Sequence, residues 1–437
     1  MAPRSEWHNW SGLESARPGR VEHPTGTADV VGAVRRARAA GTTVKMVGTG
    51  HSFTGIAKPE GTMLRPDRMS GVVAVDRDAM TVTALAGTPL HVLNARLEAL
   101  GLSLHNMGDI AEQTLAGATS TGTHGTGGTT ASLSAQLCGL ELVTGTGEVL
   151  RATRSENADV LDVARTGLGA LGVLTTLTFR VEPLFVLEAI ETPMSWDEAL
   201  DGFDERVAAH HHVDTYWFPH TDRVMTKTDD RLAVDVADAD PLPRWRAWWD
   251  DQFLSNTAFG ALHQLTNRVP ATVPTVNRVA SRLLSARRYS DVAHRVLTSP
   301  RTVPFREMEY AVPRADGLAV LREARAVLDR SDLRITFPVE IRVAPADDVP
   351  LSTAAGRDSF YLAFHTHRDV DHREYFALLE PVLRAADGRP HWGKLHTRTA
   401  TDLAPAYPRF GDFLALRDRL DPDRVFTNAY LRRVLGD

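Results

Sequence analysis

Two loops rich in glycine and threonine carry the strongest chemical signal in the first half of the sequence. The first runs through Gly48-Thr49-Gly50-His51, and the second spans residues 117–127 with the sequence GATSTGTHGTG. Glycine lets backbone N–H groups approach an anionic group closely. Each loop alone is typical of an ordinary turn, but two in one half of the chain indicate a large cofactor that carries phosphate.

Neither loop fits the best-known phosphate-binding motifs. Residues 48–53 lack the third glycine of a Rossmann fingerprint, and no acidic residue follows at the spacing that binds a ribose. The second loop lacks the Gly-Lys-Ser/Thr of a P-loop. The sequence therefore predicts a diphosphate cofactor held by another fold.

A charged pair stands in an apolar stretch of the second half. Glu340 and Arg342 are two residues apart among Val, Ile and Pro, so on a strand both side chains point to one face. This spacing indicates a buried acid–base pair, which is either catalytic or a structural ion pair.

The histidines do not follow a metal-site pattern. His365 and His367 would share a strand face, and residues 210–212 are three successive histidines. No acidic or cysteine partner stands at the spacing of a His-Glu-x-x-His site. We therefore predict no metal, and expect His365 either to line a substrate pocket or to pack within a sheet.

The composition is that of a globular chain without a basic region. The net charge of −6 and the pI of about 6.3 argue against nucleic-acid binding. Cys138 is the only cysteine, so no disulfide can form within the chain, and the N-terminus lacks the apolar core of a signal peptide. No apolar run reaches the roughly 18 residues that span a bilayer, so we expect a cytoplasmic protein without membrane association.

The pattern of short elements predicts an α+β fold with two or three domains. Before residue 185 we expect helices at 27–40 and 90–100, and strands at 45–47, 72–75, 81–85, 140–143, 149–152 and 172–181. After residue 185, apolar stretches at 303–313 and 335–343 predict a broad antiparallel sheet. Residues 240–300 look mainly helical, and a last helix is expected at 408–420.

A family resemblance joins these signals. Motifs in collinear order across nearly the whole chain resemble the vanillyl-alcohol-oxidase superfamily of flavoproteins, and more narrowly the sugar-1,4-lactone oxidases and alditol oxidases. These motifs are VGTGHSFTGIA (47–57), NMGDIAEQT (106–114), AGATSTGTHGTG (116–127), GLGALGVLTT (167–176), EMEYAVPR (307–314), FPVEIR (337–342), PHWGKLHT (390–397) and DPDRVFTNAY (421–430). Residues 185–300 carry the least resemblance.

The resemblance implies the fold and the cofactor. It implies a two-subdomain FAD-binding domain of PCMH type at 1–185, a cap domain built on a large antiparallel sheet flanked by helices at 186–395, and a C-terminal segment, 396–437, that returns to the FAD domain. His51 matches the histidine that bonds covalently to the flavin 8α-methyl carbon. The other implied cofactor-binding residues are Val47, Gly48, Thr49, Gly50, Ser52, Gly108, Asp109, Thr114, Gly117, Ala118, Thr119, Ser120, His124 and Val173.

The resemblance also implies a catalytic set of Glu340, Arg342 and Lys394. Arg342 would stabilise negative charge on the reacting oxygen, and Glu340 would orient substrate hydroxyls. We expect Lys394, buried beside Arg342, to have a lowered pKa and to accept the hydroxyl proton. Further candidates for substrate contact are Asp109, His365 and His396.

The implied function is oxidation of a sugar-1,4-lactone of the gulono-, galactono- or arabinono-lactone type. The C2 hydroxyl would become a 2-keto or ene-diol lactone by hydride transfer to flavin N5, with oxygen reduced to hydrogen peroxide. Gly108 resembles the glycine that admits oxygen to the flavin in oxidases of this family. The alternatives are oxidation of a polyol such as xylitol or sorbitol at C1, a dehydrogenase with another acceptor, a non-catalytic flavin carrier, and a tailoring enzyme for another metabolite.

Overall fold

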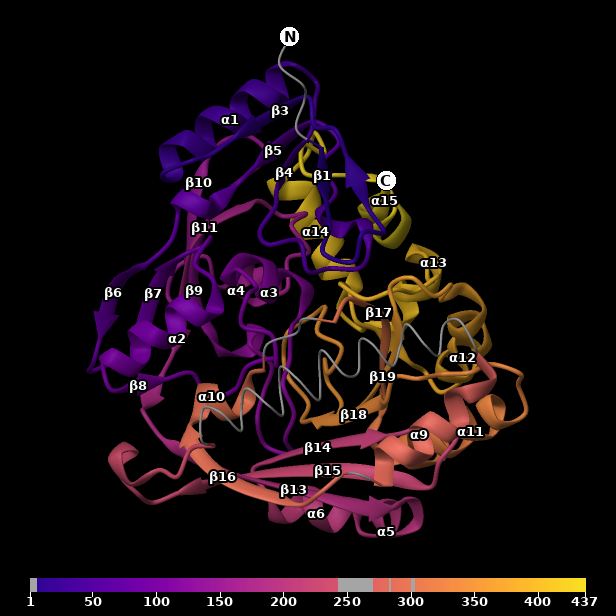
Figure 1. The fold of residues 1–437 in the computed structure, drawn as a ribbon. Helices are drawn as coiled ribbons and strands as arrows, with labels where there is room; N and C mark the ends of the chain where they lie inside the picture. The colour runs from indigo at the N-terminus through magenta and orange to yellow at the C-terminus, as the bar shows by residue number, and fades with distance from the viewer. Residues whose placement is uncertain (1–5, 243–269, 283, 300–302) are drawn as a thin grey trace.

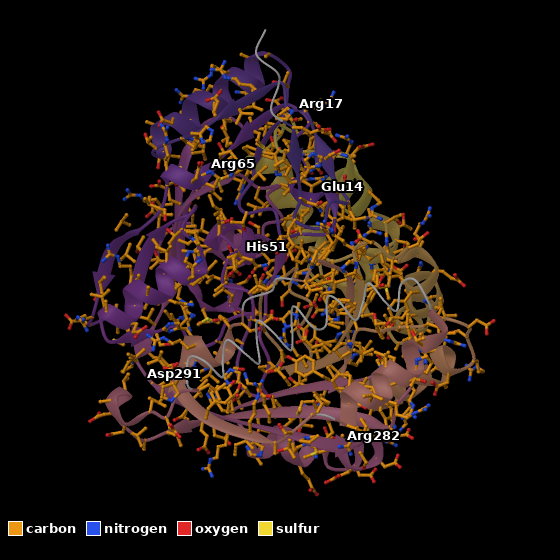
Figure 2. All side chains as sticks on the ribbon, in the orientation of Figure 1. Glu14, Arg17, His51, Arg65, Arg282 and Asp291 are labelled. Atoms are coloured by element: carbon orange, nitrogen blue, oxygen red, sulfur yellow. The ribbon has the colours of Figure 1, made fainter. Side chains whose placement is uncertain are left out.

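The computed structural model describes residues 6–242, 270–282, 284–299 and 303–437. Figure 1 shows two regions: N-terminal elements in indigo and purple above, and a long sheet in magenta and orange at the base. Figure 2 shows His51 near the middle of the molecule, between Arg65 of the upper region and Asp291 and Arg282 of the base. Among the described residues, no helix has the length and apolar character needed to cross a membrane.

A small parallel sheet and its covering helix begin the upper region. Strands pair in the order β3 (Arg20–Glu22), β5 (Thr62–Leu64) and β4 (Val44–Met46). Helix α1 (Thr27–Ala39) packs on this sheet because Val30, Val34 and Ala37 fall on one face and are buried. A hairpin of β1 (Trp7–His8) and β2 (Ser15–Ala16) precedes it.

A five-stranded antiparallel sheet completes the upper region, in the order β10-β9-β11-β7-β6. All five strands fall where the sequence predicts strands. They are β6 (Val72–Asp76), β7 (Thr81–Leu85), β9 (Leu137–Val143), β10 (Val149–Thr153) and β11 (Val173–Arg180). Their apolar side chains form one buried cluster with those of α2 (Leu90–Ala99), α3 (Leu115–Thr121) and α4 (Ala158–Ala164). Two short strands, β8 (Leu102–Ser103) and β12 (Glu182–Pro183), pair beside it.

The base is an eight-stranded sheet in which every pairing is antiparallel, as the sequence predicts. The strand order is β16-β13-β15-β14-β18-β19-β17-β20. The strands are β13 (Val186–Ser195), β14 (His212–Trp217), β15 (Arg223–Leu232), β16 (Arg287–Val292), β17 (Phe305–Pro313), β18 (Val339–Ala344), β19 (Ser359–His367) and β20 (Arg389–Pro390).

The expectation that residues 240–300 are mainly helical is wrong for β16. Helices α9 (Val273–Arg282) and α10 (Ala293–Leu297) agree with it, and residues 243–269 lie outside the described residues. Two ion pairs hold β16 on β13: Arg287 lies 2.5 Å from Glu191, and Arg288 lies 2.7 Å from Glu188. Because these contacts cross between distant strands, the local sequence does not reveal them.

Helices cover one face of the base sheet. They are α5 (Trp196–Asp201), α6 (Phe203–Ala209), α11 (Gly317–Asp329) and α12 (Arg373–Ala385). They form an apolar cluster with alternate residues of three adjacent strands, namely Met308, Tyr310, Val312, Val339, Ile341, Val343, Phe360, Leu362 and Phe364. The residues between these point to the opposite face, which carries the charged side chains predicted to do chemistry.

The C-terminal residues return to the upper region, where Figure 1 shows them in yellow. They form α13 (Ala400–Leu403), α14 (Phe410–Leu420) and α15 (Ala429–Leu435), and α14 begins two residues after the predicted start. Phe413 joins the buried cluster of the five-stranded sheet, and Phe426 packs with α1. With β12 ending at Pro183 and β13 beginning at Val186, we propose domain limits of 1–185, 186–395 and 396–437.

Substitution of Phe413 by alanine tests whether the C-terminal segment is part of the first core. Phe413 is fully buried, so Phe413→Ala should lower the free energy of unfolding by about 3–5 kcal/mol, measured by denaturant titration. The control Leu414→Ala, at a partly buried position one residue on, should cost about half as much or less. Equal losses in the two variants would contradict the packing described for α14.

Candidate cofactor and substrate site

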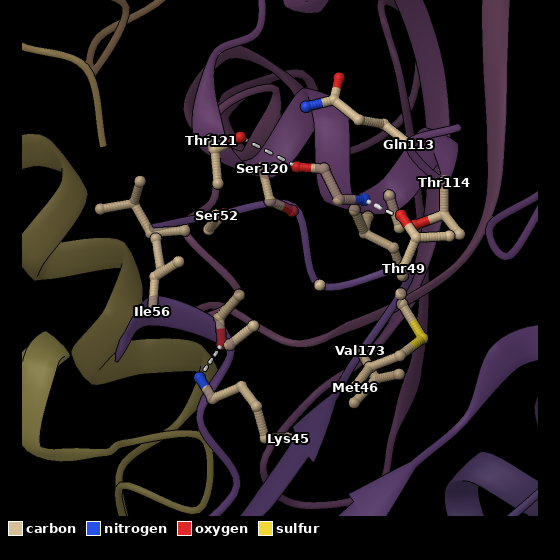
Figure 3. Close-up of a pocket in the computed structure, with 18 of the residues that line it drawn as sticks. Lys45, Met46, Thr49, Ser52, Ile56, Gln113, Thr114, Ser120, Thr121 and Val173 are labelled. Carbon is tan, nitrogen blue, oxygen red and sulfur yellow. Dashed lines mark hydrogen bonds between the residues drawn. The ribbon is translucent and has the colours of Figure 1, made fainter. Parts of the chain in front are cut away.

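A cleft of about 830 Å³ opens where the first glycine loop leaves β4. Its walls come from residues 48–52, the start of α3, residues between 168 and 174, and Phe426. Figure 3 shows Thr49 beside Thr114, with Ser120 and Thr121 on α3. The backbone N–H groups of residues 48–52 donate no hydrogen bond to any described residue. These free donors along the wall of a cleft fit an anionic cofactor.

The two predicted glycine loops meet at Gly48. A Cβ added there would overlap the Thr114 hydroxyl. Thr114 is the N-cap of α3, and its Oγ1 accepts a hydrogen bond from the Gly117 N–H at 3.3 Å. Residue 48 must therefore be glycine for the first loop to pack on the start of α3, and both loops then face the same cleft.

Most of the predicted cofactor residues line this one cleft, and three others are buried in the hydrophobic core. The cleft is lined by Gly48, Thr49, Gly50, His51, Ser52, Thr114, Gly117, Ser120 and Val173. Val47, Ala118 and Thr119 are fully buried and do not line it. The Val47 N–H donates to the Leu64 carbonyl, and the Thr119 hydroxyl donates to the Leu115 carbonyl at 2.9 Å. The side chains of these three residues pack in the core, and their assignment as cofactor-binding residues stays a prediction.

Sequence reasoning missed Lys45, which lines the cleft from β4. Its Nζ donates to the carbonyl oxygens of Gly169 at 3.1 Å and Phe426 at 2.7 Å, so one side chain joins three distant segments. Burial lowers the pKa of Lys45 to about 7, although Asp421 and Glu60 oppose the shift. The signal available in the sequence was a lysine enclosed by the apolar residues of a short strand.

A smaller cavity, of about 340 Å³, adjoins the cleft, and His51 lines both. The His51 ring stacks on Trp10 with centroids 5.6 Å apart. Burial lowers the pKa of His51; Glu112 opposes this shift and Lys394 reinforces it. The ring is therefore neutral at pH 7 and keeps a nucleophilic lone pair. Lys394 lines the same cavity, so the predicted covalent histidine and the predicted catalytic lysine face one space.

Glu340 and Arg342 form the ion pair that their spacing predicts. The Glu340 Oε1 lies 2.7 Å from the Arg342 guanidinium, which also donates from Nε to Asp214 at 2.8 Å and lies 3.7 Å from Asp109. Burial raises the pKa of Glu340 although Arg342 opposes it. Burial would lower the pKa of Arg342, but the three carboxylates outweigh it and raise that pKa. Sequence reasoning missed Asp214, although an acid within an apolar strand carries the same signal as Glu340.

Lys394 is paired with carboxylates rather than placed against Arg342. Its Nζ contacts Glu307 Oε2 and lies 4.0 Å from Glu309 Oε2. Burial would lower the pKa of Lys394, but these carboxylates outweigh it and raise the pKa above its ordinary value. The expected lowered pKa is wrong because the prediction considered Arg342 and overlooked Glu307 and Glu309. Both acids alternate along β17, the same signal that identified Glu340 and Arg342.

His124 contacts Glu309 and is not among the residues that line the cofactor cleft. Its Nε2 is 2.8 Å from Glu309 Oε1, and its Nδ1 is 2.8 Å from the Gly125 carbonyl oxygen. The His124 ring is therefore held between a carboxylate and a backbone carbonyl oxygen. Burial raises the pKa of Glu309, but His124 and its neighbours outweigh this and lower it.

His391 adds a third residue to this pair. Ligand-type atoms of His124, Glu309 and His391 all lie within 4.8 Å of one another. Burial lowers the pKa of His391 to about 4, so the ring is neutral. Its Nδ1 accepts the Gly393 N–H at 3.1 Å, which leaves the hydrogen on Nε2 and no lone pair there for a metal. We therefore assign this cluster to charge pairing.

The remaining substrate candidates lie in different places. Asp109 is beside Arg342, and His365 Nε2 is 3.5 Å from Glu307 Oε1. His396 is buried and lines neither cavity; its Nε2 lies 2.9 Å from the Tyr430 hydroxyl. Burial lowers the pKa of His396 to about 3, so it is a neutral residue that packs α15.

Comparisons with known proteins agree with this site. Residues 177–434 match the family model of D-arabinono-1,4-lactone oxidase, and residues 18–153 match that of the FAD binding domain. L-gulono-1,4-lactone dehydrogenase of Mycobacterium tuberculosis is 39% identical over 430 residues, which cover 98% of this chain and 99% of that protein. L-gulonolactone oxidase of Bos taurus is 31% identical and alditol oxidase of Streptomyces sp. 32% identical, each over 98% of both chains.

These matches and the cleft define a flavoprotein oxidoreductase whose cofactor is FAD. The chain belongs to the D-arabinono-1,4-lactone oxidase family, a family of sugar-1,4-lactone oxidoreductases. Its fold is that of cholesterol oxidase from Brevibacterium sterolicum, with a TM-score of 0.78 and 18% identity over 98% of this chain and 96% of that chain. The predicted α+β fold, with a PCMH-type FAD domain and a large antiparallel sheet, is thereby confirmed.

Substitution of Gly48 by alanine tests the contact between the two glycine loops. Because the added methyl group would overlap Thr114, Gly48→Ala should lower stability by about 1–3 kcal/mol and reduce the FAD content of the purified protein. Thermal unfolding and flavin absorbance measure both effects. In the control Gly411→Ala the added Cβ meets no atom within 4 Å, so full FAD content is expected. Unchanged stability and FAD content in Gly48→Ala would show that the loops do not need this close approach.

Proposed function

We propose that the protein is an FAD-dependent oxidase of a sugar-1,4-lactone. It would oxidise the C2 hydroxyl to a 2-keto or ene-diol lactone and reduce oxygen to hydrogen peroxide. The observation that supports this most is the cavity lined both by His51 of the cofactor loop and by Lys394 of the sheet side. A small polar substrate bound there would lie between the cofactor loop and the charged face of the sheet.

FAD, when bound, supplies the acceptor for two electrons and leaves the protein to bind, orient and stabilise. Lys394 is held as an ammonium ion by Glu307 and donates to the substrate oxygen as that oxygen becomes negative. Arg342 is a second fixed cation, because its guanidinium forms ion pairs with Glu340 at 2.7 Å and with Asp214 at 2.8 Å. Glu340 also orients substrate hydroxyls in this proposal.

A lactone suits these cations better than a simple alcohol. A C2 oxygen that loses its proton stands next to the lactone carbonyl oxygen, which itself carries partial negative charge, so two electron-rich oxygens lie side by side. Two preorganised cations, Lys394 and Arg342, match that distribution of charge. A polyol has no such carbonyl; the similarity to alditol oxidase nevertheless makes C1 oxidation of a polyol the second candidate.

The test is a panel of L-gulono-, L-galactono- and D-arabinono-1,4-lactones together with xylitol and sorbitol. Peroxide formed aerobically from lactones supports the proposal, and peroxide from polyols alone transfers the assignment to the second candidate. Flavin that is bleached anaerobically by lactone yet forms no peroxide in air supports a dehydrogenase, as in the relative from Mycobacterium tuberculosis. Flavin that none of these compounds bleaches refutes all three assignments.

We further propose that His51 bonds covalently to the flavin 8α-methyl carbon. The proposal draws on its place in the cofactor cleft and on its lowered pKa, which keeps the ring neutral and nucleophilic. His51→Ala should therefore release its yellow colour into the supernatant on acid precipitation, whereas the unsubstituted protein retains it in the pellet. The neighbouring variant Ser52→Ala should also retain it. A yellow pellet from His51→Ala would place the bond elsewhere.

Gly108 is proposed to admit oxygen to the flavin. Gly108→Ala should slow reoxidation of the reduced flavin by oxygen about tenfold, with a smaller effect on reduction by substrate, both measured by stopped flow. The added Cβ would lie 2.7 Å from the Thr123 methyl carbon, so strain must be separated from gating. Thr123→Ser removes that methyl group and serves as the background control. If Gly108→Ala is slow only when Thr123 is present, the effect is strain and the gating role is wrong.

A further inference from the structure

Lys394 cannot accept the substrate proton unless it gives up one of its own. The carboxylates of Glu307 and Glu309 raise its pKa, so the resting side chain is an ammonium ion. An ammonium ion has three donors and no lone pair. The hydroxyl proton of the substrate therefore needs another destination within reach of Lys394.

Glu307 is the carboxylate in contact with Lys394, and it has a second neighbour. Its side chain is 4% exposed, and its Oε1 lies 3.5 Å from His365 Nε2. The His365 Nδ1 lies 3.3 Å from the Pro338 carbonyl oxygen, which only accepts, so Nδ1 carries hydrogen. Glu307 therefore has a polar neighbour on each of its two carboxylate oxygens, Lys394 at Oε2 and His365 at Oε1.

We infer that Glu307 is the terminal acceptor of the substrate hydroxyl proton, which reaches it through Lys394. This inference rests on the proposed function for its substrate and oxidant. As the C–H hydrogen leaves with its electron pair to the flavin, the electrons of the O–H bond form the carbonyl. Lys394 takes the hydroxyl proton and passes one of its own to Glu307 Oε2. Lys394 ends as an ammonium ion, as it began, and Glu307 ends protonated.

The surroundings of Glu307 return it to its ionised state after each turnover. Lys394 and His365 outweigh burial and hold the pKa of Glu307 below its ordinary value, so the carboxyl group readily gives up the proton it receives. The next turnover requires only that this one proton leave.

The titratable groups that face this pair come from several elements. Among the described residues they are Glu309 on β17, His365 on β19, His391 beside β20, and Asp109 and His51 from loops of the upper region. Burial opposes charge on Glu307 as on Lys394, but Lys394 and His365 outweigh it, and the pKa of Glu307 lies below its ordinary value. Because the pKa of Glu307 is lowered and that of Lys394 is raised, the pair is charged at neutral pH.

The test is the pH dependence of anaerobic flavin reduction by L-gulono-1,4-lactone in the holoenzyme. The unsubstituted enzyme should show a flat rate from about pH 6 to 9, because the charged pair always offers a carboxylate. In Glu307→Gln, flavin reduction should be about 100-fold slower at pH 7, and its rate should rise about tenfold per pH unit. Lys394 must then lose a proton to solvent before it can accept one from the substrate. The matched control Glu307→Asp keeps a carboxylate and should stay flat, although slower.

Two further measurements separate proton transfer from a structural role. FAD content and the midpoint of thermal unfolding should be the same in the Gln and Asp variants. In a Lys394→Met background, Glu307→Gln should slow flavin reduction by less than about threefold, because the route through Lys394 is already absent.

A flat profile and a rate within about threefold of the unsubstituted enzyme in Glu307→Gln would overturn the inference. Fully additive losses in the double variant would overturn it too. If neither L-gulono-1,4-lactone nor a polyol bleaches the unsubstituted enzyme, the proposed function has failed, and the inference with it.

Discussion

The alternation of side chains along β17, β18 and β19 is the constraint on which the rest of the site depends. One face of these strands must be apolar, because four helices bury it. The other face is then free to carry charge, and it presents Glu307, Glu309, Glu340 and Arg342 toward the region that holds the cofactor loops. A slip of one residue in any of the three strands would exchange the two faces and bury the charges among the helices.

Burial of so many charges is tolerated only because each has a partner. Isolated ions cost several kcal/mol each to remove from water, and pairing offsets this only with good geometry. Lys394 contacts Glu307, and Glu309 is paired with His124. Arg342 collects carboxylates from two further elements. The array is therefore rigid as a unit, which is what a site needs when it must hold fixed cations against a developing negative charge.

Sequence reasoning located the parts of the site that depend on local patterns. The glycine loops and the Glu340–Arg342 pair follow from spacing alone, and the antiparallel base sheet follows from apolar alternation. Reasoning failed where a property is set by a partner distant in sequence. The pKa of Lys394 is raised by Glu307, and β16 pairs with β13, about 100 residues earlier in the chain. No local window contains both members of such a pair.

Lys45 has a consequence for how the holoprotein is made. Its ammonium group bonds to the carbonyl oxygen of Phe426, 381 residues further along the chain, and both residues line the cofactor cleft. During synthesis the glycine loops emerge early, but the wall supplied by Phe426 does not exist until the cap sheet has been translated. In a nascent chain the phosphate-binding loops are therefore present while the cofactor cleft is still incomplete. Flavin binding follows translation and requires a chain whose cap domain has already folded.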